Sequence, residues 1–189
     1  MVNQALNRNT VRKNFVAQLR KESSMKVVKR FIDCDVAPFV PDGWKLESHK
    51  GCGKMEVACT SAGLYLNGEM VNLHLSENQK RYGSASGNDL QAQLDGKAVL
   101  NANVLDWLLD HREFIPKGWR GATGKKVNPF FWGTTYCQRN LEVCQHAFSV
   151  RCLLLYRNRW DWGSREAYWT DDGSDPHWYL NDPAAILGA

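Results

Sequence analysis

The chain has 189 residues, of which 43% are hydrophobic, 11% aromatic and 23% charged. This composition is typical of one globular domain and excludes a disordered chain, a coiled coil and a collagen. No apolar run approaches the roughly 18 residues of a membrane span and no signal peptide is recognisable, so we expect a cytoplasmic protein without membrane contact. Six cysteines without a secretory signal favour reduced thiols over a disulfide scaffold.

Basic charge is concentrated at the N-terminus. Residues 1–30 contain eight basic residues and one acidic residue, whereas the rest of the chain is mildly acidic. Val11, Phe15 and Leu19 recur there at spacings typical of an amphipathic helix. We therefore divide the chain into a basic N-terminal helix or arm, residues 1–24, and a single domain, residues 25–189.

Strands are expected through the first half of the domain. Residues 26–40 are rich in β-formers, and short strands are predicted over residues 44–47 and 55–59. The clearest local signal is Asn67-Gly68, because these residues suit the two positive-φ positions of a type I′ turn. This turn would join strands at residues 64–66 and 70–75, with Tyr65 opposite Met70.

A polar loop and two central helices are expected next. Residues 77–88 are polar and rich in glycine and serine, which indicates a loop. A short helix is predicted after Asn88 and ends at Gly96. A second helix is predicted from about Ala102 to Arg112, with Asn101 as its N-cap and a stripe of leucine and valine facing the core.

The C-terminal third has the pattern of an antiparallel meander. Strands are predicted over residues 130–137, 148–156 and 160–162, with a turn at Arg157-Asn158 and a turn-rich tail over residues 171–189. The predicted fold class is therefore α+β. It consists of an antiparallel sheet of about six to eight strands, two central helices on one side of it and the N-terminal amphipathic helix.

Aromatic residues are concentrated near the C-terminus. Within 20 residues of sequence, several tryptophans and tyrosines lie beside aspartates. They either fill the core or form an exposed surface that binds a protein, a sugar or a base. The aspartates disfavour a phosphate backbone here, so a protein is the favoured partner. The candidate binding residues of this surface are Trp160, Trp162, Tyr168, Trp169 and Trp178.

Two other kinds of function remain open. A small hydrolase or transferase could use the carboxylates and imidazole of Asp33, Asp35, Glu47 and His49. Nucleic acid could bind the basic N-terminal segment, residues 1–30, through Arg12, Lys13 and Arg20, unless these residues form a solvated helix face. No nucleophile elbow, phosphate-binding loop or dinucleotide motif is present.

No metal or other cofactor is expected. One set of possible zinc ligands is Cys137, Cys144, His146 and Cys152, and a looser set is His49, Cys52 and Cys59. Neither set has the paired Cys-x2-Cys spacing of a structural zinc site, so packed or semi-exposed thiols are the favoured interpretation.

Several sequence motifs follow one another along the domain. They are LNANVLDWLL over residues 100–109, Ile115-Pro116, Trp119, FFWGTTY over residues 130–136, VRCL over residues 150–153 and RWDW over residues 159–162. In this order they resemble a group of small uncharacterised bacterial proteins, over roughly residues 30–189. The resemblance implies a bacterial or phage-linked intracellular protein and supplies no catalytic residues. Our leading hypothesis is a non-enzymatic binding or regulatory module that acts through an aromatic surface. Its narrower form is a phage-linked inhibitor of a defence system such as an anti-CRISPR protein.

Overall fold

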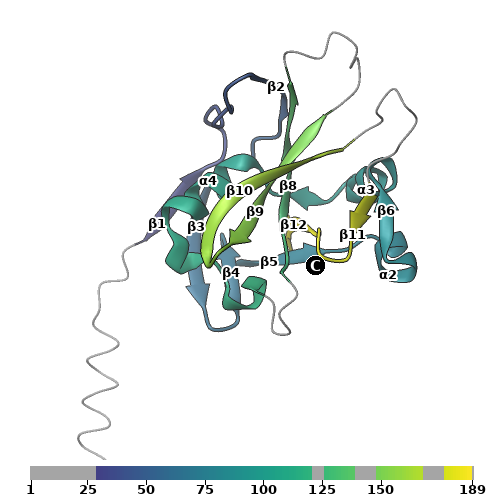
Figure 1. Cartoon of the computed structure of the whole chain (residues 1–189). Helices are drawn as coiled ribbons and strands as arrows, with labels where there is room; N and C mark the ends of the chain where they lie inside the picture. The colour runs from purple at the N-terminus through teal and green to yellow at the C-terminus, as the bar shows by residue number, and fades with distance from the viewer. Residues whose placement is uncertain (1–28, 121–125, 139–147, 168–176, 189) are drawn as a thin grey trace, which may run out of the picture.

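The computed structural model describes residues 29–120, 126–138, 148–167 and 177–188. Strands are the most common element of the described chain, and ten of them form one sheet with the strand order β1-β3-β4-β5-β12-β8-β9-β10 along its main path. Strand β2 pairs with β8 and strand β7 with β12 beside this path (Figure 1). The strands are β1 (Arg30–Asp33), β2 (Trp44–His49), β3 (Lys54–Thr60), β4 (Gly63–Leu66), β5 (Glu69–His74), β7 (Ala98–Val99), β8 (Phe130–Gln138), β9 (Ser149–Tyr156), β10 (Arg159–Glu166) and β12 (Ala184–Leu187).

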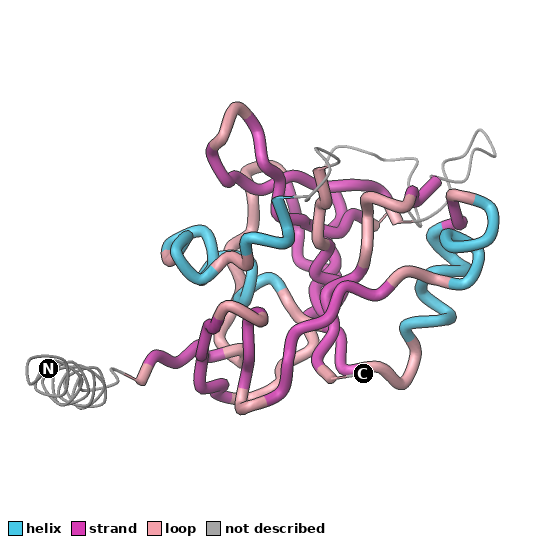
Figure 2. Tube along the Cα trace, turned by 90° about the horizontal axis from the view of Figure 1, so that it is seen from below, coloured by secondary structure: helices cyan, strands magenta, loops and turns pink. Residues whose placement is uncertain are grey.

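Helices are few and lie at the flanks of this sheet (Figure 2). The described residues contain α2 (Glu77–Tyr82), α3 (Gly87–Leu94), α4 (Ala102–Asp110) and the 3-10 turns η1 (Arg112–Phe114) and η2 (Lys117–Arg120). A two-stranded ribbon of β6 (Ser84–Ser86) and β11 (His177–Tyr179) lies beside α2 and α3. None of the described helices is long and apolar enough to cross a bilayer.

The predicted α+β class is therefore wrong. The fold is mostly β, and its sheet is larger than the expected six to eight strands. The sheet is also mixed, because β12 runs parallel to β8 while its other pairings are antiparallel. Helices α3 and α4 do not share one side of the sheet, since their buried residues belong to two separate cores. The N-terminal helix predicted within residues 1–24 lies outside the described residues.

The two cores lie on opposite faces of β8 and β9. On β8, Phe131 packs into the core beneath α4, whereas Phe130 and Trp132 pack against α3 and Trp178. Neighbouring side chains of a strand point to opposite faces, so a strand covered on both faces is apolar at every position. The unbroken apolar start of β8 follows from this position between two cores.

Helix α4 confirms the sequence prediction closely. It begins after Asn101, whose side chain accepts a hydrogen bond from the Asn103 backbone N–H at 3.2 Å. The stripe of Val104, Leu105 and Leu108 is completely buried. The Asn-Gly hairpin is also confirmed: Asn67 and Gly68 have φ of +50° and +83°, and Tyr65 pairs with Met70.

Two predictions about irregular segments are wrong. Residues 77–88, expected to form a loop, contain α2 and β6. The tail, expected to consist of turns, contains β12, which lies between β5 and β8 in the sheet. The meander of β8, β9 and β10 is confirmed, and its second turn has positive φ at both Arg157 and Asn158.

Candidate functional site

The predicted aromatic residues are divided between the core and the surface. Trp160 and Trp178 are buried, 3% and 0% exposed, so neither ring contributes to an exposed surface. Trp178 packs between Phe130, at 4.5 Å between ring centroids, and Trp132, at 4.8 Å. Trp162 is only partly buried. Tyr168 and Trp169 lie outside the described residues, as do Arg12, Lys13 and Arg20 of the basic segment.

Trp162 belongs to an aromatic cluster that sequence reasoning missed. Its ring packs edge-on against Phe39 and Trp44, at 6.3 and 6.5 Å between ring centroids. Trp44 packs in the same way against Tyr136, at 5.9 Å between centroids. These rings come from β10, β2, β8 and the loop between β1 and β2, which are far apart in the chain. The pairing of β2 with β8 brings them together at one end of the sheet.

The guanidinium of Arg151 lies at the centre of this cluster. Its Cζ atom is 4.9 Å from the Trp162 ring centroid, 5.1 Å from that of Phe39 and 6.0 Å from that of Tyr136. Cations are attracted to the negative faces of aromatic rings, and desolvation strengthens this attraction. Arg151 is only 1% exposed.

The carboxylate of Asp106 on α4 neutralises this buried charge. Arg151 donates two hydrogen bonds to it, from Nη1 to Oδ2 at 3.1 Å and from Nη2 to Oδ1 at 2.7 Å. A bidentate pair of this kind fixes the plane of the guanidinium. Because the plane is fixed, Arg151 presents a defined face to the aromatic rings above it.

The loop over residues 34–43 is held against this cluster by hydrogen bonds to its backbone. Asn103 Nδ2 donates to the carbonyl of Val36 at 2.8 Å, and the Tyr136 hydroxyl donates to the carbonyl of Phe39 at 3.0 Å. Burial raises the pKa of Tyr136 above its usual range, so this hydroxyl remains a donor. The loop is therefore anchored from both β8 and α4.

Anchoring the loop leaves its apolar side chains exposed. Val36 is 52% exposed, Phe39 53% and Val40 36%. Together with the partly buried Trp44 and Trp162, they form what we call the Phe39 patch: Val36, Phe39, Val40, Trp44 and Trp162. An apolar group held outward by specific contacts is the type of surface that marks interaction sites.

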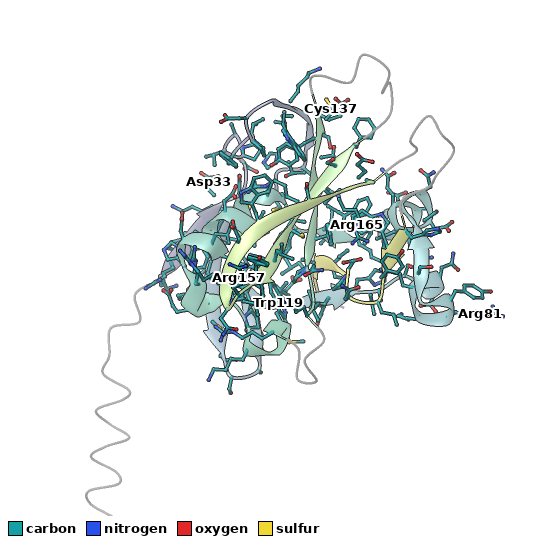
Figure 3. All side chains as sticks on the ribbon, viewed as in Figure 1. Asp33, Arg81, Trp119, Cys137, Arg157 and Arg165 are labelled. Atoms are coloured by element: carbon teal, nitrogen blue, oxygen red, sulfur yellow. The ribbon has the colours of Figure 1, made fainter. Side chains whose placement is uncertain are left out.

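The loop that carries Val36, Phe39 and Val40 is acidic. Residues 33–42 contain the exposed aspartates Asp33, Asp35 and Asp42 and no lysine or arginine. Figure 3 places Asp33 at the loop side of the molecule, apart from Arg165 on the other side of the central strands. The patch therefore favours a partner that offers apolar side chains beside basic ones.

The four residues of the enzyme hypothesis do not form one site. Both ring nitrogens of His49 are engaged, Nδ1 with Thr134 Oγ1 at 2.8 Å and Nε2 with the Cys34 carbonyl at 3.0 Å. Asp35 accepts a hydrogen bond from the Gly53 backbone, while Glu47 lies beside Cys137. These contacts hold the backbone in place and leave His49 without a free nitrogen for acid–base chemistry.

Three cavities of the described residues are formed by other side chains. One, of about 780 Å³, lies between the β3–β4 hairpin and the 3-10 turns; two smaller ones measure about 420 and 310 Å³. None of these three is lined by Asp33, Asp35, Glu47 or His49. Within the described ranges, no group of three or more histidine, cysteine or acidic side chains is arranged to hold a metal ion. Cys144 and His146 of the first possible zinc set are outside those ranges.

The Phe39 patch had one sequence signal. Pro38 and Pro41 bracket Phe39-Val40, and prolines in such positions restrict a segment to an extended, loop-like conformation. An apolar pair inside a segment of this kind is a candidate for exposure. The contact of Phe39 with Arg151, which is more than 100 residues away in the chain, could not be predicted from the local sequence pattern.

Comparison with protein-family models, with curated proteins and with solved structures finds no significant match to this chain.

Proposed function

We propose that this chain is a binding module that docks on another protein through the Phe39 patch. The observation that carries the proposal is the exposure of Phe39, 53%, on a loop whose backbone is held by Asn103 and Tyr136. Rigid aromatic anchors dominate the binding energy of protein interfaces. An anchor that is already positioned loses less conformational freedom on binding.

The acidic loop favours one chemistry of partner. Asp33, Asp35 and Asp42 attract a surface that carries lysine or arginine around an apolar centre. The same aspartates repel a phosphate backbone, so nucleic acid is disfavoured at this patch. Binding of nucleic acid through residues 1–30 would be a separate activity of the basic segment.

Site-specific photo-crosslinking in the native cell tests the proposal. With p-benzoylphenylalanine in place of Phe39, we expect an adduct of one defined mass that contains a second protein. The matched control is the same replacement at Tyr156, which is 56% exposed and lies outside the patch. Trp162→Ala, introduced together with the crosslinker at position 39, should abolish the adduct because it removes a ring that supports Phe39.

Three results would contradict the proposal: no adduct from position 39, the same adduct from position 156, or an adduct that is destroyed by nuclease. The narrower form of the proposal, a phage-linked inhibitor such as an anti-CRISPR protein, predicts that the crosslinked protein is a subunit of a defence complex. Identification of the crosslinked protein by mass spectrometry distinguishes this narrower proposal from the general one.

A further inference from the structure

Two cysteines meet where β1 and β3 stop pairing. Cys34 follows β1, and its backbone N–H donates to the Gly53 carbonyl at 3.0 Å. Gly53 has φ of +77°, so the chain turns there, directly before β3. The turn brings Cys52 beside Cys34: Asn101 Nδ2 donates to the Cys34 carbonyl at 2.9 Å and lies 4.0 Å from the Cys52 sulfur, and the side chains of the two cysteines interact.

The two thiols differ in access to solvent. Cys34 is completely buried, whereas Cys52 is exposed and lines the cavity of about 310 Å³. Lys50 and Lys97 line the same cavity, together with apolar residues such as Met55 and Leu187. A small reagent can therefore reach Cys52 but not Cys34.

The surroundings favour the thiolate form of Cys52. The hydrogen bond from Cys34 and, to a lesser extent, the charge of Lys50 lower the pKa of Cys52; burial and Asp35 oppose this shift. The same hydrogen bond and burial raise the pKa of Cys34, which keeps its proton. Asn101 Nδ2 approaches the Cys52 sulfur at 4.0 Å as a further weak donor.

We propose that Cys34 and Cys52 form a thiol–disulfide site that reduces hydroperoxides, in which Cys52 attacks and Cys34 resolves. The Cys52 thiolate attacks the terminal oxygen of the hydroperoxide; a sulfur–oxygen bond forms, the oxygen–oxygen bond breaks, and the alkoxide leaves and takes a proton from water. Cys34 then attacks the Cys52 sulfur, so that a disulfide forms and hydroxide leaves with the Cys34 proton as water.

These two reaction steps balance in electrons and protons. Two thiols lose two electrons and two protons, and the hydroperoxide is converted to one alcohol and one water. A low-molecular-weight dithiol restores the site by thiol–disulfide exchange and becomes a disulfide itself. The buried position of Cys34 does not prevent resolution, because Cys52 is already in contact with it.

Cys59 is a matched control within the same chain. It is exposed like Cys52, but burial raises its pKa and its sulfur donates a weak hydrogen bond to the Thr60 carbonyl at 3.8 Å. Cys152 is buried and its pKa is raised to about 12. Reactivity that followed exposure alone would therefore be equal at Cys52 and Cys59.

The first test measures thiol reactivity in the reduced full-length protein. Iodoacetamide at neutral pH should alkylate Cys52 faster than Cys59, because the pKa of Cys52 is lowered and that of Cys59 is raised, which gives Cys52 the larger thiolate fraction. The Cys52 rate should also persist to lower pH. Lys50→Gln should move the midpoint of this profile to higher pH, whereas Lys45→Gln, an exposed lysine outside the cavity, should not.

The second test uses hydrogen peroxide and peptide mapping without a reductant. We expect a linkage between the peptides that carry Cys34 and Cys52, reversed by dithiothreitol. In Cys34→Ser, a sulfenic acid that dimedone traps should accumulate at Cys52, while Cys59→Ser should form the linkage normally. Equal alkylation of Cys52 and Cys59, or a peroxide product that links Cys52 to a different cysteine or to a second chain, would overturn the proposal. Neither of these measurements on the wild-type protein depends on a variant folding.

Discussion

Arg151 is a charged residue in a position where most strands carry an apolar one. It lies on β9 between positions that face the other core, and its side chain is enclosed by rings and by Asp106. Replacing a buried ion pair by apolar residues often leaves stability unchanged. The ion pair of Arg151 and Asp106 has an effect that apolar residues in its place would not have. It fixes a flat cationic surface on which the Phe39 ring rests.

Asp106→Ala should destabilise the protein strongly, because it leaves the Arg151 guanidinium buried without a counter-charge. Breaking a buried pair in this way costs about 3–5 kcal/mol, and the partial exposure of Asp106, 29%, favours the lower value. Urea denaturation followed by tryptophan fluorescence measures the free energy of unfolding.

The control for this variant is Asp110→Ala, one turn further along α4 at an exposed position. It should change the free energy of unfolding by no more than about 0.5 kcal/mol. If Asp106→Ala were as stable as Asp110→Ala, the ion pair would contribute nothing to the fold.

At the scale of elements, sequence reasoning succeeded where the signal is local. The Asn101 cap of α4 and the Asn67-Gly68 turn depend on residues next to one another, and both are present in the structure. The strand predicted over residues 148–156 is likewise present, as β9. The Phe39 patch depends on the pairing of β2 with β8, and no local pattern specifies such a pairing.

Helix α2 is the element whose signal was present and overlooked. Ser76 Oγ accepts a hydrogen bond from the Gln79 N–H at 3.1 Å, and Gln79 Oε1 accepts one from the Ser76 N–H at 2.8 Å. This reciprocal arrangement is a capping box, and its spacing is visible in the sequence. Its glycine and serine neighbours indicated a loop because they form the turn into β6.

Ser76→Ala should lower the free energy of unfolding by about 1 kcal/mol, because it removes the oxygen that caps α2. Ser164→Ala, at an exposed position of β10, serves as the control and should be neutral within about 0.5 kcal/mol. Thermal unfolding measured by circular dichroism distinguishes the two. Equal midpoints would mean that α2 does not need its cap.

At the scale of the whole molecule, the fold depends on one short strand. Strand β12 lies between β5 and β8, and also pairs with β7. Its residues Ala184, Ala185 and Ile186 are small or apolar and buried, but four residues with two alanines give no periodic signal. This is why the mixed, ten-stranded sheet could not be predicted as one unit.

Deleting residues 184–189 should abolish cooperative unfolding, because it separates the two halves of the sheet and exposes the edges of β5 and β8. Deleting residues 1–24 should leave the urea transition unchanged, as expected for an arm outside the domain. Urea titration of both shortened chains, followed by tryptophan fluorescence, provides the comparison. A cooperative transition in the chain that lacks β12 would contradict the central position of this strand.

The position of β12 also affects how the protein is made. Since β12 follows every other described strand in the sequence, a ribosome exposes the edges of β5 and β8 before it releases the segment that joins them. Until residue 187 has been synthesised, the nascent chain therefore exposes the unpaired edges of two incomplete halves of the sheet to other polypeptides. Slower translation of this last stretch would lengthen the period in which chaperones are needed.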